Sequence, residues 1–102
     1  MFRDFPLHHL HTGKCLVSRE PTLVSTILGS CVAVTMHAPR LRCSGVCHAF
    51  LPSLQDGYPE IPGNNQECRF VDSAIEHLLQ RLARLGARPD ELEIKLFGGS
   101  AG

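Results

Sequence analysis

Cys31 and His48 are the two residues whose types and setting could together perform nucleophilic chemistry. Cys31 lies in the apolar run Thr-Ile-Leu-Gly-Ser-Cys-Val-Ala-Val over 26–34, and His48 lies in a second apolar run over 45–51. A cysteine becomes a nucleophile when its thiolate is stabilised and a base lies close to it, and histidine is the commonest base. The pair therefore predicts a small cysteine hydrolase in which His48 accepts the proton of Cys31.

The elements that must position this pair are two predicted strands. The segments 31–37 and 45–51 are rich in apolar and β-branched residues, and the Ala-Pro-Arg sequence at 38–40 separates them, which favours a hairpin. If the hairpin turns near residues 40–41, Ala33 lies opposite His48. Cys31 and His48 then become diagonal neighbours on one face of the hairpin, close enough for long side chains to meet.

Small and hydroxyl-bearing residues just before Cys31 could complete such a site. A turn at Gly29 and Ser30 would offer free backbone N–H groups to a developing oxyanion and leave room for a substrate. Ser25 and Thr26 could orient the imidazole or the substrate through their hydroxyl groups. The sequence therefore predicts a substrate-binding region on the N-terminal side of the nucleophile.

The remaining elements indicate one mixed domain over 1–102. Short strands are predicted over 14–18, 22–28 and 92–97, and the stretch before residue 14 is expected to be irregular. Leucine and other apolar residues recur at helical spacing over 71–85, which predicts an amphipathic helix. Between the second hairpin strand and this helix, 52–67 is a polar loop of a length typical of binding loops. Strands interleaved with one helix indicate an α/β or α+β fold.

Composition excludes several classes of protein. The 102 residues carry ten basic and ten acidic side chains, so the sequence lacks the basic character of a nucleic-acid binder. No apolar run approaches the length of a membrane span, and the N-terminus does not read as a signal peptide, so we expect a cytoplasmic protein with no membrane insertion. Five cysteines are an odd number for a disulfide framework, so we expect free thiols, mostly buried.

Two longer motifs give the sequence a family resemblance. The segment Ser-Thr-Ile-Leu-Gly-Ser-Cys-Val-Ala-Val over 25–34, followed by Gly-Val-Cys-His-Ala-Phe-Leu-Pro over 45–52, resembles the CheD family of chemoreceptor glutamine deamidases. The segments 69–72, 85–88 and 95–99 are similar to the same family. The likeness runs in the right order from about Thr22 to Gly99.

This resemblance implies a protein-glutamine deamidase of methyl-accepting chemotaxis receptors that uses a thioester and needs no metal or cofactor. The family nucleophile falls on Cys31, its histidine on His48, and its third position, a threonine in the family, on Ser25. The implied fold is an α/β/β/α sandwich, and the implied regulatory partner is a CheC-type phosphatase.

Two departures leave alternatives open. The family usually has alanine after the Phe-Gly-Gly motif, where this sequence has Ser100. The family usually continues with further strands and a helix after the Phe-Gly-Gly motif, so a chain this short would leave a sheet edge open, which an oligomer could cover. The alternative function is therefore a catalytically weak or inactive binding module that docks a CheC-type phosphatase or a receptor. A zinc site built from Cys43, Cys47, Cys68 and His48 is a further alternative, but adjacent strand residues point to opposite faces.

Overall fold

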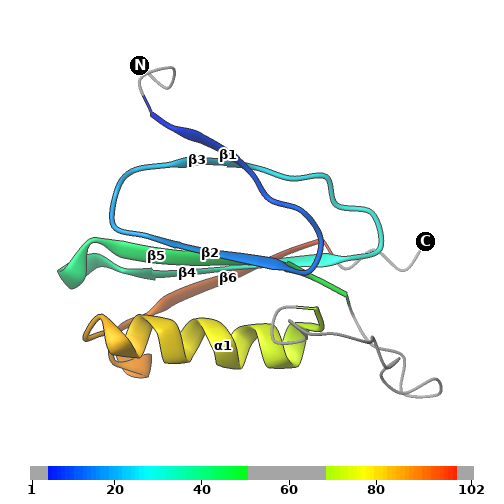
Figure 1. Ribbon diagram of the computed structural model, residues 1–102. Helices are drawn as coiled ribbons and strands as arrows, with labels where there is room; N and C mark the ends of the chain where they lie inside the picture. Colours follow the sequence, from blue (N-terminus) through cyan, green and yellow to red (C-terminus); the bar gives the residue numbers. More distant parts are fainter. Residues whose placement is uncertain (1–4, 51–68, 99–102) are drawn as a thin grey trace.

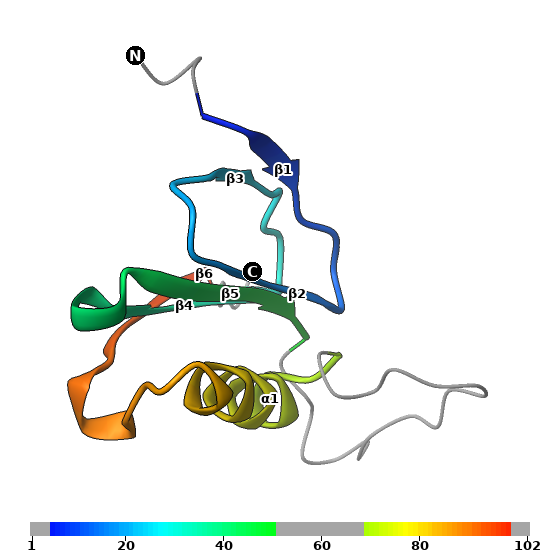
Figure 2. The same ribbon diagram turned by 60° about the vertical axis from the view of Figure 1, so that its left-hand side comes forward.

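The computed structural model describes residues 5–50 and 69–98, and the predicted polar loop over 52–67 lies outside them. The described part forms three layers, with a four-stranded antiparallel sheet in the middle, one helix on one face and a two-stranded ladder on the other (Figure 1 and Figure 2). In chain order the elements are β1 (Leu7–His9), β2 (Lys14–Ser18), β3 (Leu23–Ser25), β4 (Val32–Ala38), β5 (Cys43–Ala49), α1 (Val71–Arg84) and β6 (Glu93–Gly98), with 3₁₀ turns at Pro39–Leu41 and Pro89–Glu91.

The predicted hairpin is the centre of the sheet. β4 and β5 pair antiparallel with Ala33 opposite His48, which confirms the predicted register. The 3₁₀ turn at Pro39–Leu41 connects them, and Arg42 closes it in the left-handed region with φ of 52°. β2 pairs with the outer side of β5 and β6 with the outer side of β4, so the order across the sheet is β2-β5-β4-β6.

Alternation along β4 and β5 divides their side chains between the two faces. One face packs on α1 and forms the core, which consists of Val34, Met36, Ala38, Cys43, Cys47, Ala49, Ala74, Leu78, Leu82 and Ala87. The helix approaches β5 so closely that a Cβ atom at Gly45 would lie 3.0 Å from the Leu78 side chain. Since His48 follows Cys47, its side chain faces away from α1.

The helix confirms the predicted leucine pattern and is tied to the sheet at both ends. The Phe50 N–H donates to the Arg69 carbonyl (2.8 Å) and the Val71 N–H donates to the Phe50 carbonyl (3.0 Å), so the chain enters the helix directly beside the end of β5. At the other end Gly86 adopts a φ of 101°, which glycine tolerates without a Cβ penalty, and its carbonyl accepts a hydrogen bond from Arg40 of the hairpin turn at 3.0 Å. The helix is thereby held along the sheet.

The ladder on the other face departs from the predicted elements. β1 pairs parallel with β3, so the N-terminal segment expected to be irregular contains a strand. The strand predicted over 22–28 ends at Ser25, where the Ser25 carbonyl accepts a hydrogen bond from the Leu10 N–H at 2.8 Å. Both differences arise from pairing between segments distant in sequence, which local β propensity does not encode.

The mixed fold class is confirmed. The described residues supply helix, sheet and second sheet layer, and the outer helical layer of the expected α/β/β/α sandwich is not among them. Within 5–50 and 69–98, no helix is long and apolar enough to cross a membrane. These layers place the open face of β5, which carries His48, beneath the β1–β3 ladder (Figure 2).

Candidate functional site

His48 is a buried polar residue of the sheet, and both of its ring nitrogens have hydroxyl partners. Its side chain is only 3% exposed, and the Thr26 and Thr12 hydroxyl groups lie at opposite ring nitrogens. Thr26 Oγ1 lies 2.7 Å from Nδ1, and Thr12 Oγ1 lies 3.3 Å from Nε2. A buried imidazole held at both nitrogens has a defined orientation.

The Thr26 hydroxyl determines which nitrogen of the neutral ring carries the proton. Thr26 Oγ1 donates its single proton to the Leu10 carbonyl at 2.7 Å, because a carbonyl can only accept. The same oxygen must therefore accept from His48, whose Nδ1–H donates to it. Nε2 is left with the free electron pair, so it is the atom that can accept a proton.

A pocket of about 450 Å³ opens beside this imidazole. It lies between the β1–β3 ladder and the sheet, and its lining residues are His9, Leu10, His11, Thr12, Ser25, Thr26, Ile27 and His48. The structure therefore brings His48 together with two predicted residues, Ser25 and Thr26. Ser25 lines the pocket without a hydrogen bond to His48 within the described part of the chain, and Thr26 contacts the ring directly.

Cys31 immediately precedes β4 and is 9% exposed. Its neighbour Val32 pairs with Ala49 on one side and with Gly98 on the other, so its backbone is held between two strands. Over residues 5–50 and 69–98, no hydrogen bond joins Cys31 to His48. Cys31 thus lies just before the start of β4, and β4 pairs with β5, the strand of His48. The side chains of Cys31 and His48 are not hydrogen-bonded within the described residues.

Gly98 fixes the path of the Cys31 backbone. A Cβ atom at Gly98 would lie 2.7 Å from the Cys31 carbonyl oxygen, and Gly98 has a φ of 89°. Both facts require glycine there. By contrast, Gly29 has no atom within 4 Å of the position of a Cβ, and both Gly29 and Ser30 are exposed in a bend before Cys31.

The other described cysteines lie away from this face. Cys43 and Cys47 are free and fully buried against α1, and burial raises the pKa of the Cys47 thiol. Cys47 and His48 point to opposite faces of β5, as the argument against a zinc site requires, while Cys68 lies outside the described residues. The expectation that all five cysteines are free is wrong for Cys15, which is disulfide-bonded. An odd number of cysteines requires that at least one stays unpaired within the chain, but it does not prevent two others from forming a disulfide.

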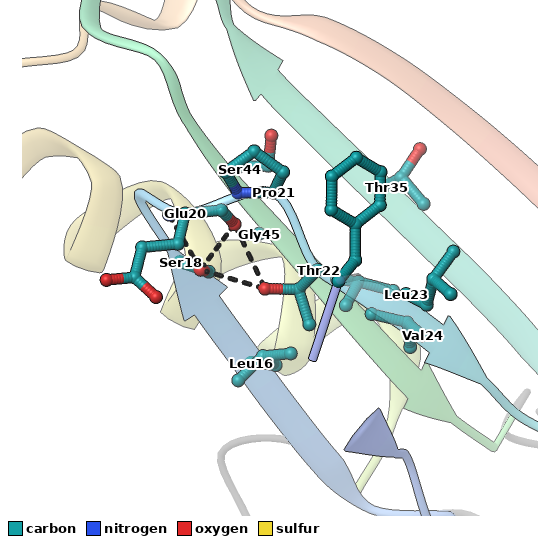
Figure 3. Close-up of a pocket in the computed structure, with 12 residues that line it drawn as sticks. Leu16, Ser18, Glu20, Pro21, Thr22, Leu23, Val24, Thr35, Ser44 and Gly45 are labelled. Carbon is teal, nitrogen blue, oxygen red and sulfur yellow. Dashed lines mark hydrogen bonds between the residues drawn. The ribbon is translucent and has the colours of Figure 1, made fainter. Parts of the chain in front are cut away.

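A second cavity, of about 380 Å³, lies at the other end of the same interface. It is lined mainly by apolar side chains of the ladder and of the open sheet face, among them Leu16, Leu23 and Val46 (Figure 3). Ser18 and Thr22 close one side through hydrogen bonds to the Glu20 carbonyl. Among its lining residues there is no cysteine or histidine, in contrast to the pocket beside His48.

Sequence reasoning missed three residues of the site. Thr12 reaches His48 from the turn before β2, Leu10 supplies the carbonyl that orients the Thr26 hydroxyl, and Gly98 admits the Cys31 carbonyl. Only Gly98 had a signal, as a glycine that ends a predicted strand. Thr12 and Leu10 act through long-range contacts that leave no local pattern.

The fold and the site define a small α+β domain whose sheet presents a hydroxyl-bound histidine to a pocket. Residues 51–102 match the family described as CheD chemotactic sensory transduction. A protein of Maridesulfovibrio salexigens named "Probable chemoreceptor glutamine deamidase CheD" is 52% identical over 93 residues, which are 91% of this chain and 55% of that protein. Proteins of the same name from Oleidesulfovibrio alaskensis and Nitratidesulfovibrio vulgaris are 45% and 41% identical over 93% and 95% of this chain, and 43% and 48% of their own lengths are covered.

The chain therefore belongs to the CheD family, which confirms the resemblance of its motifs. It spans about half the length of these curated relatives.

Proposed function

We propose that this chain carries the nucleophile and the base of a protein-glutamine deamidase that acts on methyl-accepting chemotaxis receptors. Its family membership supports the reaction class, since the relatives are named chemoreceptor glutamine deamidases. The observation that carries the chemical assignment is the Thr26-bound His48, whose Nε2 is the proton-accepting atom beside a pocket.

Cys31 is the proposed nucleophile because the sheet register favours its approach to His48. Ala33 lies directly opposite His48, and Cys31 precedes Ala33 by two residues, so strand alternation favours the same face for both side chains. Hydrogen bonds between catalytic groups are often long before substrate binds. The absence of a Cys31–His48 bond in the described chain is therefore compatible with the assignment.

In the proposed reaction, His48 Nε2 takes the proton of the Cys31 thiol, and the thiolate sulfur forms a bond to the γ-carboxamide carbon of glutamine. Exposed backbone around Gly29 and Ser30 supplies N–H donors for the oxyanion. His48 then returns the proton to the leaving nitrogen, which departs as ammonia and leaves a thioester. Water, deprotonated by His48, cleaves the thioester to glutamate and restores the thiol.

Thr12 has a defined place in this sequence of steps. Its hydroxyl occupies Nε2 in the free protein at 3.3 Å, a long hydrogen bond from an exposed residue. This bond must open before Nε2 accepts the Cys31 proton. The loss is small, because a hydrogen bond to solvent replaces it.

The test is ammonia release from a chemoreceptor fragment that carries substrate glutamines. Wild-type protein should release ammonia, and Cys31→Ala and His48→Ala should each abolish it. Cys47→Ala is the matched control, because Cys47 packs on α1 behind the active face. The proposal is overturned if folded wild-type protein releases no ammonia, or if Cys31→Ala retains full activity.

A second candidate function is an inactive module that docks a receptor or a CheC-type phosphatase. One observation favours it: the Thr12 hydroxyl lies at Nε2 of His48, the atom that would act as the base. Binding of a receptor fragment without ammonia release would support this candidate. The cytoplasmic location of this protein stays a prediction.

A further inference from the structure

We propose that the Thr12 hydroxyl binds the carboxamide nitrogen of the substrate glutamine, and that it thereby selects an amide over an ester. The inference rests on the proposed function, because it concerns the leaving group of that reaction. Thr12 Oγ1 lies 3.3 Å from His48 Nε2, the atom that protonates the leaving nitrogen in the proposed steps. A general acid must lie within hydrogen-bond reach of the group that it protonates. Thr12 therefore stands next to the place that the leaving nitrogen must occupy.

Thr12 and Cys31 approach His48 from opposite sides. β5 lies between β2 and β4, and its residue His48 is opposite Lys14 on one side and Ala33 on the other. Thr12 precedes Lys14 by two residues. Cys31 likewise precedes Ala33 by two residues, and both pairings are antiparallel, so Thr12 and Cys31 lie toward the same end of β5. A carboxamide carbon bonded to the Cys31 sulfur thus has its leaving nitrogen on the side of Thr12.

The backbone holds Thr12 at this position. The Gly13 N–H donates to the His48 carbonyl at 2.6 Å, and the Lys14 N–H donates to the His11 carbonyl at 3.1 Å. Gly13 has a φ of 84°, a conformation that glycine adopts readily. The turn that carries Thr12 is therefore fixed to the backbone of His48 itself. Its place beside Nε2 follows from these main-chain bonds.

The hydroxyl proton of Thr12 determines which kind of group it can bind. Nε2 of the neutral ring carries an electron pair, so the hydroxyl donates its single proton there. Its oxygen then has only electron pairs to offer, which suit an amide N–H. After Nε2 takes up the thiol proton, the hydroxyl turns its own proton to solvent, and its oxygen remains an acceptor.

A methyl ester lacks both properties that this contact requires. Its leaving oxygen carries no hydrogen for Thr12 to accept, and its methyl group needs more room beside Nε2 than an amide hydrogen does. A site built to bind a substrate N–H discriminates against an analogue that lacks it. The geometry at Thr12 is thus complementary to a primary amide.

Binding of two receptor fragments to Cys31→Ala protein tests the inference, because this variant keeps the pocket and lacks the nucleophile. One fragment carries a substrate glutamine, and the other carries the γ-methyl ester of glutamate at the same position. Titration calorimetry should show tighter binding of the glutamine fragment. Adding Thr12→Val should weaken that binding roughly fivefold, the usual cost of one hydrogen bond, and leave the affinity for the ester within about twofold. Valine has the shape of threonine without its oxygen.

Two variants serve as controls in the same Cys31→Ala protein. Thr12→Ser keeps the hydroxyl and should keep the preference for glutamine. Thr22→Val removes a hydroxyl that donates to the Glu20 carbonyl in the other cavity, and it should change neither affinity.

A purely structural effect of Thr12→Val would weaken the binding of both fragments equally, and this outcome overturns the inference. An unchanged preference for glutamine overturns it as well. Binding of neither fragment also overturns it, and ammonia release by wild-type protein then shows whether the proposed function still stands.

Discussion

At the residue scale, one carbonyl determines the chemistry available to the site. The Leu10 carbonyl takes the Thr26 hydroxyl proton, so the hydroxyl must accept from His48 Nδ1 and leave Nε2 free. The family position that falls on Ser25 lies one residue earlier in the sequence, where β3 ends. The structure therefore gives the orienting contact to Thr26, and leaves Ser25 on the pocket wall.

We expect that the His48 ring of Thr26→Val no longer has one fixed tautomer. Nitrogen NMR of the wild-type imidazole should show the Nδ1–H form, whereas Thr26→Val should give a mixture, because valine can neither donate nor accept. The rate of Cys31 alkylation near neutral pH should fall roughly tenfold or more, the range expected when a general base is misplaced.

Two further variants separate the hydroxyl from packing effects. Thr26→Ser should retain the tautomer and most of the rate, because it keeps the hydroxyl. Ser25→Ala should leave the tautomer unchanged. If Ser25→Ala shifts the tautomer and Thr26→Val does not, the orienting role belongs to Ser25.

The free cysteines should differ in alkylation rate. Cys31 should react first in native protein, and Cys47 should react only as the protein unfolds, because its thiol is buried and burial raises its pKa. Mass spectrometry of alkylated peptides at several times measures both rates. His48→Ala should slow Cys31 alone. Equal rates for Cys31 and Cys47 would contradict the assignment.

At the scale of elements, β6 supports Cys31, the proposed nucleophile, from the side opposite β5. Its last residue, Gly98, pairs with Val32, the residue after Cys31. Because the Cys31 carbonyl occupies the space of a Gly98 side chain, the two segments can approach only if residue 98 is glycine. β6 thus holds the Cys31 backbone in place.

Gly98→Ala should therefore perturb Cys31. The added methyl group meets the Cys31 carbonyl, and alanine is strained at this φ, so we expect a loss of roughly 1–3 kcal/mol in the free energy of unfolding. Cys31 alkylation should also change in rate. Gly29→Ala is the matched control, since open space surrounds that position, and its free energy of unfolding should stay within about 0.5 kcal/mol of wild type. Equal effects of the two substitutions would disprove the steric account.

At the scale of the whole molecule, Glu91 joins parts of the chain that are distant in sequence. Its carboxylate accepts two hydrogen bonds from the Arg40 guanidinium, at 3.0 and 2.9 Å, and a third from the Arg88 N–H at 2.8 Å. Arg40 also donates to the Gly86 carbonyl at 3.0 Å. The hairpin turn, the end of α1 and the start of β6 are thus linked.

This link should make stability depend on pH. The Arg40 hydrogen bond and the Arg88 N–H lower the pKa of Glu91 from 4.5 to about 2. A carboxyl whose pKa is lower in the folded state stabilises the fold above its unfolded pKa, and this contribution is lost as the pH falls through the folded value. Stability should therefore decline between about pH 5 and pH 2.

Glu91→Gln should remove this part of the pH dependence. The variant should unfold more easily than wild type above pH 5, and its free energy of unfolding should fall less steeply below it. Urea unfolding at a series of pH values measures both slopes. Asp90→Asn, at the neighbouring exposed carboxylate, should leave the wild-type slope intact. Identical slopes for wild type and Glu91→Gln would refute the prediction.

Local sequence determined the central hairpin and the helix. The Pro39 break between two β-rich runs was sufficient for the register of Ala33 against His48, because one buried face leaves little freedom for slippage. The leucine spacing over 71–85 was sufficient for α1, because a helix buries one periodic face. The motifs around Cys31 and His48 likewise carried the family assignment.

Tertiary structure alone decided how the histidine is held. Thr12 and Thr26 reach His48, and the Leu10 carbonyl reaches Thr26, only because β1 pairs with β3 above the sheet. Neither strand signals that pairing in its own residues. For the same reason the contact of Gly98 with Cys31 depends on β6 lying beside β4. Periodicity and propensity describe how a segment buries its own face, whereas these contacts depend on which distant segment lies opposite it.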